Sequence, residues 1–232
     1  ISYSGACSSG TSSASVGENT ITLNTLNDGS YSGCELTVTD VAGNATQLAL
    51  GNFSIDATPP VLSMEQSIPS FINESSPFLI FSSSEPGIIS YSGSCSSSTT
   101  QITEGGQHTI ALNQLSEGYY HGCSLSVTDS SGNTSTPLSI APFTIDLTKP
   151  SGFSYLTSIN TSASQASRYL SAADANGIDS YCISTYSTSP TTSSGCWTTV
   201  SSTNNFVKNS TTFSYGAADA LYVWYKDAAT NI

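Results

Sequence analysis

The chain repeats one segment along its length. Residues 36–46 read LTVTDVAGNAT, and residues 125–135 read LSVTDSSGNTS, 89 positions later. A third version, VWYKDAATNI, occupies 223–232. A unit of about 90 residues can bury a core of its own, so a chain of 232 residues is expected to form tandem domains rather than one large domain. We predict three, with bounds at 1–58, 59–148 and 149–232.

The two outer domains are expected to be incomplete as written. The opening residues, ISYSGACSSG, match ISYSGSCSSS at 89–98, so the sequence begins inside a repeat. The third repeat ends with its copy of the shared segment, before the strand that would follow. We therefore expect residues 1–58 to be the C-terminal part of a domain, and residues 149–232 to lack a last strand.

The hydrophobic pattern indicates strands throughout. In CELTVTD (34–40), apolar and polar residues alternate with the period of a half-buried strand. NTITLNTL (19–26) and HTIALNQL (108–115) alternate in the same way. No segment has the sustained stripe of an amphipathic helix, so the predicted fold class is all-β. In the complete repeat we expect seven strands, which favours a sandwich of two sheets: 61–66, 77–83, 88–93, 99–103, 107–113, 119–128 and 134–145.

Three aromatic residues have predicted positions in this sandwich. Tyr31 of LNDGSY and Tyr120 of LSEGYY lie at the corner before the sixth strand, where a tyrosine hydroxyl can donate to the backbone upstream. Trp224 alternates with Val223 and Tyr225, so we expect its side chain on the outer face of its sheet.

The cysteines occur two to a repeat. Two of them share one repeat position and two share another, so pairing within each repeat is the simplest arrangement. Zinc binding is the alternative, but the chain has no C-x-x-C and both histidines belong to the second repeat. Disulfides indicate an oxidising, extracytoplasmic location, at the cell surface or outside the cell. The predicted pairs are Cys7 with Cys34, Cys95 with Cys123 and Cys182 with Cys196.

The motifs TVTDVAGNAT, SVTDSSGNTS, SIDATPP and TIDLTKP together resemble the bacterial immunoglobulin-like repeats that occur in tandem in large secreted and surface-anchored proteins, including adhesins. The resemblance covers essentially the whole chain and implies immunoglobulin-like β-sandwich domains in tandem. Such repeats serve as stalks, spacers and binding modules alike, so the resemblance implies the fold more strongly than a ligand. The third repeat departs from the motif, with Thr230 in place of Gly43 and Gly132.

The charge of the chain excludes several classes of partner. Its net charge is −12 with only 4 lysine and arginine residues, none of them before Lys149. Nucleic acids and anionic lipid surfaces need clustered basic residues, so we predict binding to neither. No apolar run reaches the 18 or more residues of a membrane-spanning helix, so we also predict no membrane insertion in this segment.

Acidic residues are expected to converge at the two junctions between domains. In a sandwich, the turn before the last strand and the turn after the second strand lie at the end where the preceding linker arrives. Calcium takes six to eight oxygen ligands in flexible geometry, so it would reverse the repulsion among such carboxylates. The alternative is that they only cap turns, with Lys149 as a counter-ion at the second junction. The predicted sets are Asp56, Glu85 and Asp129, and Asp146, Asp174 and Asp227.

No catalytic constellation is found in the sequence. A hydrolytic triad needs a positioned base, and His108 and His121 are replaced by Asn19 and Ser32 at the matching positions of the first repeat. We therefore predict no enzymatic activity and no catalytic residue. Aromatic side chains could stack on sugars, although packing within the sheets is the simpler interpretation: Tyr119, Tyr120, Trp197 and Trp224.

The sequence leaves three functions open. The first is a stalk or spacer of a bacterial extracellular repeat protein, which projects a binding tip and contacts neighbouring repeats of the same polypeptide. The second is a filament subunit, in which incomplete domains receive strands from copies of the chain. The third is a carbohydrate-binding module with a host or glycan receptor.

Overall fold

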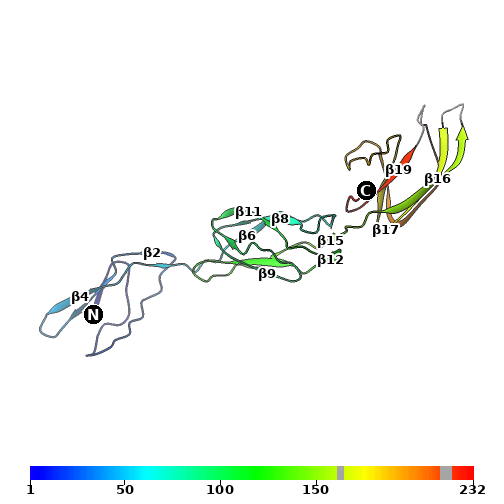
Figure 1. Cartoon of the computed structure of the whole chain (residues 1–232). Coiled ribbons are helices and arrows are strands. Elements are labelled where there is room, and N and C mark those ends of the chain that lie inside the picture. The colour runs from blue at the N-terminus through cyan, green and yellow to red at the C-terminus, as the bar shows by residue number, and fades with distance from the viewer. Residues whose placement is uncertain (161–164, 215–220) are drawn as a thin grey trace. The chain divides into compact units, whose positions relative to one another are not determined.

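The structure is a computed structural model that describes residues 1–160, 165–214 and 221–232, with the backbone alone for 153–160, 165–168 and 209–214. Every regular element in these ranges is a strand, so the all-β prediction is confirmed (Figure 1). Accordingly, the described ranges contain no helix long and apolar enough to span a membrane. The chain forms two compact units, Ile1–Pro60 with Thr128–Ser135, and Val61–Val127 with Thr136–Ile232.

The first unit contains two small antiparallel sheets. β3 lies between β1 and β4 in one sheet, and β2 pairs with β5 in the other. The Cys7–Cys34 disulfide ties the segment after β1 to the residue before β3. The strands are β1 (Ser2–Ser4), β2 (Gly29–Tyr31), β3 (Glu35–Thr39), β4 (Ala45–Ala49) and β5 (Phe53–Ile55).

One predicted strand of this unit does not form. Residues 19–26 have no strand in the structure, although they alternate like residues 108–115. The copy in the second repeat forms β11 (Gly106–Ala111) because it pairs along its length with β8 (Phe78–Ser83). No strand of the described ranges pairs with residues 19–26, although the Asn24 N–H donates to the Ser8 carbonyl at 2.8 Å. Alternation alone does not make a strand when no neighbouring strand pairs along its length.

The second unit begins with three sheets around one core. Their orders are β10-β9-β13-β14, β11-β8-β6 and β12-β15-β7, an arrangement consistent with a β-sandwich. Leu79, Phe81, Ile110 and Val127 have no exposed surface and centre the core. The other strands are β6 (Leu62–Gln66), β7 (Phe71–Ile72), β9 (Gly87–Ser92), β10 (Gln101–Ile102), β12 (Gly118–Tyr120), β13 (Ser124–Thr128), β14 (Leu138–Ser139) and β15 (Phe143–Ile145).

The last two predicted strands of this repeat are each divided. Residues 119–128 form β12 and β13, and residues 134–145 form β14 and β15. Both segments change sheet at the same level, since β13 pairs with β14 and β12 pairs with β15. Pro142 lies in the second break, where it has no N–H for a ladder. The parallel partner of β15, β7, was not predicted because two residues are too few to show a period.

The predicted tyrosine corners are present in both repeats. Tyr31 Oη donates to the Asn27 carbonyl at 2.7 Å, and Tyr120 Oη donates to the Ser116 carbonyl at 2.9 Å. Each ring also stacks on a phenylalanine of the partner strand, with centroids 5.4 Å apart in both cases. The position of these tyrosines therefore follows from the sequence.

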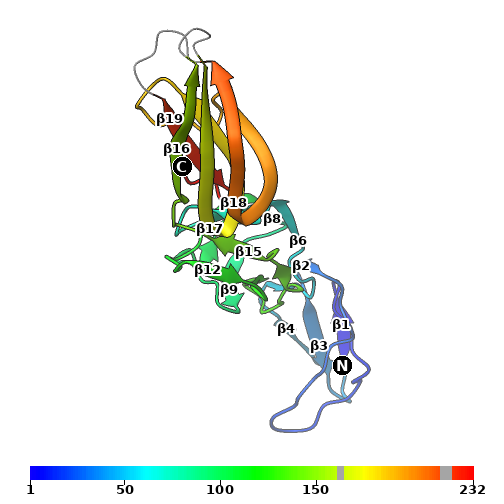
Figure 2. The same cartoon turned by 90° about the vertical axis from the view of Figure 1, so that its right-hand side faces the viewer.

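The remainder of the second unit is a four-stranded sheet with its own small core. β17 (Gln165–Ser184) lies between β16 (Ser151–Asn160) and β18 (Trp197–Ser214), and β19 (Tyr222–Asp227) also pairs with β17 (Figure 2). Its hydrophobic cluster is separate from the first and centres on Leu170, Ile178, Tyr181, Phe206 and Tyr225. Trp224 lies on the face opposite Tyr225, but it is half-buried and its indole N–H is shielded without a partner.

Three disulfides are present, and they are the pairs that the repeat predicts. Cys7–Cys34 and Cys95–Cys123 span 27 and 28 positions, while Cys182–Cys196 spans 14. No cysteine is left free in the chain. The first two join a loop to a distant strand, but the third closes a loop between two consecutive strands, β17 and β18.

Candidate metal centre

The shared segment, Asp-x-x-Gly-Asn in two repeats and Asp-x-x-Thr-Asn in the third, forms a tight turn in all three repeats. In the first repeat, Asp40 Oδ1 accepts the N–H groups of Ala42 and Asn44 at 2.8 and 2.9 Å. The Asn44 side-chain amide holds the pKa of Asp40 below its usual value, with the turn N–H groups adding to the effect. Asp129 and Asp227 accept the corresponding N–H groups of Asn133 and Asn231 at 2.8 and 2.9 Å.

The fourth turn residue adopts a positive φ. Gly43 and Gly132 do so at 90° and 95°, and Thr230 does so at 73°, the one positive φ of a residue other than glycine in the described chain. Left-handed backbone costs a side-chain-bearing residue roughly 1–2 kcal/mol. The third turn is therefore strained at the position where the repeat motif was seen to deviate.

Replacing Thr230 with glycine is expected to stabilise the third repeat by about 0.5–1 kcal/mol, since relief of strain exceeds the extra chain entropy of glycine. Chemical denaturation followed by tryptophan fluorescence measures this repeat alone, because both tryptophans lie in it. The reverse change, Gly132→Thr, should destabilise the second repeat. An unchanged or lower midpoint for the Thr230 variant would contradict the strain.

The asparagine of the turn also binds the linker that precedes its repeat in two of the three cases. Asn231 Nδ2 donates to the Asp227 carboxylate at 2.8 Å and to the Asp146 carbonyl at 2.9 Å, so it holds the segment that enters the third repeat. Asn133 Nδ2 likewise donates to the Asp56 carbonyl at 3.0 Å. Asn44 has only the intraturn bond, to Asp40 Oδ2 at 2.9 Å. In two repeats the turn thus binds the preceding linker.

A second acidic residue holds each linker from the repeat that precedes it. Glu117 Oε2 accepts the Thr148 hydroxyl at 2.8 Å and the Leu147 N–H at 3.3 Å. Asp28 accepts the Ala57 N–H at 2.9 Å and the Thr58 hydroxyl. Sequence reasoning missed this pair, although each precedes the glycine of a tyrosine corner and each linker carries the same Ile-Asp-x-Thr pattern.

Three carboxylates meet where the second linker enters the third repeat. Asp146 comes from the linker after β15, Asp174 from β17 and Asp227 from the end of β19. One ligand oxygen of each lies within 4.8 Å of the others, so the structure brings together the set that the sequence predicts. Their exposed fractions are 0%, 8% and 1%, respectively, so the cluster is almost entirely removed from solvent.

A bulge in β17 places Asp174. The sequence predicts a turn between two strands here, but β17 is continuous and residues 174–177 bulge against a single residue, Asn204, of β18. Asp174 Oδ1 accepts the Asn176 N–H at 2.8 Å, and Asn204 Nδ2 donates to the Ala175 carbonyl at 2.9 Å. Gly177 closes the bulge at φ 96°, where a Cβ would come within 2.5 Å of Ser202 Oγ. The strand stays paired because the bulge absorbs the extra residues.

The electrostatics of this cluster disfavour three charges. Burial, followed by the charges of Asp146 and Asp174, raises the pKa of Asp227 to about 6 against the hydrogen bonds from Asn231. Burial likewise raises the pKa of Asp146, and the charges of Asp174 and Glu117 add to the rise. Asp146 Oδ1 accepts the Thr148 N–H at 3.2 Å, but its buried Oδ2 has no hydrogen-bond partner, although the Asn176 side chain lies near enough to lower the pKa.

No cation of the described chain neutralises the cluster. Lys149, the alternative counter-ion that the sequence offers, is exposed and forms no ion pair with Asp146 in the described chain. The ion pair found within the described ranges joins Lys226 to Asp179 at 3.8 Å. Buried charges are normally paired or bind a metal, so the Asp146, Asp174 and Asp227 oxygens form a donor set suited to a hard divalent cation.

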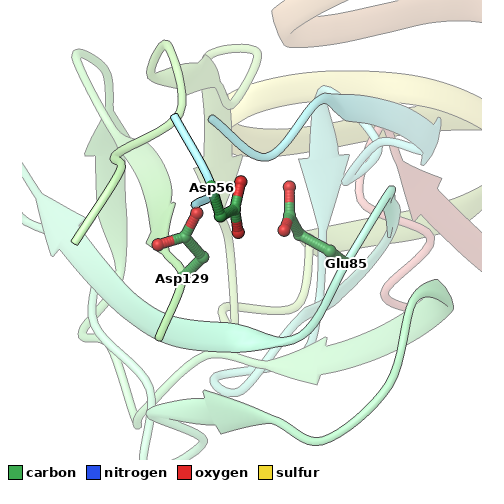
Figure 3. Close-up of side chains that lie close together, drawn as sticks. All are labelled: Asp56, Glu85 and Asp129. Carbon is green, nitrogen blue, oxygen red and sulfur yellow. The ribbon is translucent and has the colours of Figure 1, made fainter. Parts of the chain in front are cut away.

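The other predicted set divides between the two compact units. Asp56 and Asp129 belong to the first unit, with ligand oxygens within 4.8 Å of each other, while Glu85 belongs to the second (Figure 3). Ser131 Oγ donates to Asp56 Oδ2 at 3.2 Å. Burial opposes ionisation of Asp129, but hydrogen bonds from Asn133, Ser131 and Gly132 hold its pKa below the usual value. The prediction of calcium at this set stays a prediction.

The aromatic residues considered for sugar binding do not form one platform. Tyr119 and Tyr120 belong to β12, and the Tyr120 ring stacks on Phe143 of β15. Trp197 and Trp224 belong to β18 and β19, in another sheet, where both are register partners of Cys182. The two histidines contact aromatic rings, His108 that of Phe81 and His121 that of Tyr119.

Comparison with known proteins adds no assignment: the chain matches no family model, no curated protein and no solved structure.

Proposed function

We propose that this chain is a structural, non-enzymatic segment of a bacterial extracellular repeat protein, in which tandem immunoglobulin-like domains act as a stalk or spacer. The observation that carries the proposal is the double hold on the linker 146–148. Glu117 binds it from the domain that it leaves, and Asn231 binds it from the domain that it enters. Fixing a linker on both sides restricts hinge motion, as a spacer requires.

The chemistry of the chain supports an extracellular location. All six cysteines are in disulfides, which persist in oxidising compartments. A net charge of −12 with few basic residues keeps repeats soluble and separate from nucleic acids and anionic lipids. These properties suit a protein exposed outside the cell.

We further propose that calcium stiffens the second junction. Asp146, Asp174 and Asp227 would hold the ion, because each offers a carboxylate oxygen within 4.8 Å of the others. The unpartnered Asp146 Oδ2 points to a missing ligand, since a buried carboxylate oxygen without a partner costs free energy. Calcium suits this set better than magnesium, because it tolerates irregular geometry from three different segments.

The junction is tested by comparing two asparagine variants. With calcium bound, ¹⁵N relaxation should give one rotational correlation time for the two cores of the second unit. Asn231→Ala removes the hold on the Asp146 carbonyl, so the two cores should then tumble separately. Asn44→Ala is the matched control, because this turn has the same internal bond and no linker bond. Equal effects of the two variants would rule out the role of Asn231 in the joint.

The native polypeptide separates the stalk from the filament alternative. Residues 19–26 keep the strand pattern but pair with no strand of the described ranges, and this is the observation that favours strand donation. An antibody against the chain should label intact cells and detect a denatured polypeptide far heavier than 24.0 kDa if the repeats form a stalk. A polypeptide near that mass together with filaments would favour strand donation, and labelling only after permeabilisation would reject both.

A further inference from the structure

We propose that the disulfide-closed loop of the third repeat, Cys182–Cys196, is a binding site for a neutral oligosaccharide. The loop surrounds a hollow of about 580 Å³ that lies wholly between residues 183 and 196. This proposal does not depend on the stalk function, because a spacer and a binding module could both contain such a loop.

The disulfide of this loop differs in position from the disulfides of the first two repeats. In the first two repeats, the disulfide joins the loop after one strand to a strand far along the sequence, over 27 and 28 positions. In the third repeat the disulfide joins the residues at the base of one loop, 14 positions apart. The cross-link therefore closes the loop itself, between β17 and β18.

The second half of the loop, residues 191–197, is held by hydrogen bonds of its own. Ser194 N–H donates to the Thr191 carbonyl at 3.0 Å, and Thr191 N–H donates to Ser194 Oγ at 3.0 Å. Trp197 Nε1 donates to the same Thr191 carbonyl at 2.8 Å, which fixes this turn to the start of β18. A pre-ordered loop loses less conformational entropy when it binds a ligand.

The chemistry of the hollow fits sugars without charge. No carboxylate, lysine or arginine lines it, so neither acidic nor basic ligands find a counter-charge. Tyr186 also lines it and is 74% exposed, and its N–H donates to Ser184 Oγ at 2.9 Å. An exposed aromatic ring can cover the apolar face of a sugar, while hydroxyls serve as both donors and acceptors for sugar hydroxyls. The hydroxyls of the lining belong to Ser184, Thr185, Thr188, Ser189, Thr191 and Ser194.

The test is a printed array of neutral, sialylated and sulfated oligosaccharides probed with the full chain. We expect binding to neutral members, followed by measurement of the dissociation constant for the best-bound free oligosaccharide by calorimetry. Tyr186→Ala should weaken this binding about tenfold or more because the stacking surface is lost, whereas Tyr186→Phe should retain it. Tyr119→Ala is the matched control, since Tyr119 is 65% exposed on β12, in another sheet.

The outcomes decide the proposal in each case. No binding on the array, or binding to acidic members alone, overturns it. Equal loss in the Tyr186 and Tyr119 alanine variants, or no loss in the Tyr186 variant, overturns the site. Circular dichroism and a thiol assay show whether each variant keeps its fold and disulfide. Failure here would leave the relaxation and cell-labelling results for the stalk unaffected.

Discussion

Calcium is expected to raise the melting temperature of the third repeat by roughly 15–30 °C, and Asp227→Asn should remove most of this rise. A ligand at a thousandfold excess over its dissociation constant stabilises the native state by about 4 kcal/mol, and each kcal/mol shifts the melting temperature of a small domain by roughly 4–8 °C. Asp227 is 1% exposed and supplies one of the three carboxylates, so the amide weakens the site directly.

The measurement is thermal unfolding by tryptophan fluorescence in excess calcium and in excess chelator. Asp40→Asn is the matched control, since Asp40 makes the same turn bonds but is not among the clustered carboxylates. It should leave the calcium-induced shift of the third repeat unchanged. If the wild-type chain melts at the same temperature in calcium and in chelator, calcium does not bind this cluster.

The second large expected effect is an inverted dependence of stability on pH. In chelator, burial and neighbouring charges raise the pKa of Asp227 to about 6. The unfolded carboxyl titrates near 4, so between about pH 4 and 6 the folded state binds the proton more tightly. The metal-free protein should therefore be more stable at pH 4–5 than at pH 7. Its stabilisation is lost as the pH rises through about 6, and two pKa units correspond to about 3 kcal/mol.

Calcium should reverse this trend, because the ion binds the ionised carboxylates and protons compete with it. Stability in calcium is thus expected to fall on acidification from pH 7 to 5. Asp227→Asn should flatten the profile in chelator, leaving the smaller part due to Asp146, whose pKa is also raised by burial. Denaturation midpoints of the third repeat across this pH range give both profiles. If the wild-type chain in chelator loses stability between pH 7 and 5, burial does not raise the pKa of Asp227 as described.

Much of the fold follows from local pattern. Alternation located β3 and β11, and the repeat itself indicated the cysteine pairs and the tyrosine corners. The Asp146, Asp174 and Asp227 set was also predictable, because each residue lies in a segment that reads as a turn or a linker at the junction between the second and third repeats. Each of these features depends on residue types whose spacing or repetition is visible in the sequence.

The features that the sequence could not predict depend on contacts with distant segments of the chain. Residues 19–26 carry the alternating pattern but form no strand, since strand formation also needs a neighbour. The bulge at 174–177 has the composition of a turn, and only pairing with β18 keeps it inside β17. Glu117 binds Thr148 from more than 30 positions away, and Asn231 binds Asp146 from more than 80 positions away. The bond of Asn231 also ends on a backbone carbonyl, which every residue type has, so it leaves no pattern in the sequence.

The hold of Asn231 on a carbonyl oxygen has a consequence for how such a chain could evolve. A carbonyl is supplied by any residue, so the joint requires only Ile-Asp-x-Thr on one side and the terminal asparagine of the turn on the other. Duplication, deletion or shuffling of whole repeats would then preserve the contact between each linker and the next repeat without compensating mutations. The number of repeats could change by unequal crossing-over, and each newly adjacent pair of repeats would form this contact immediately.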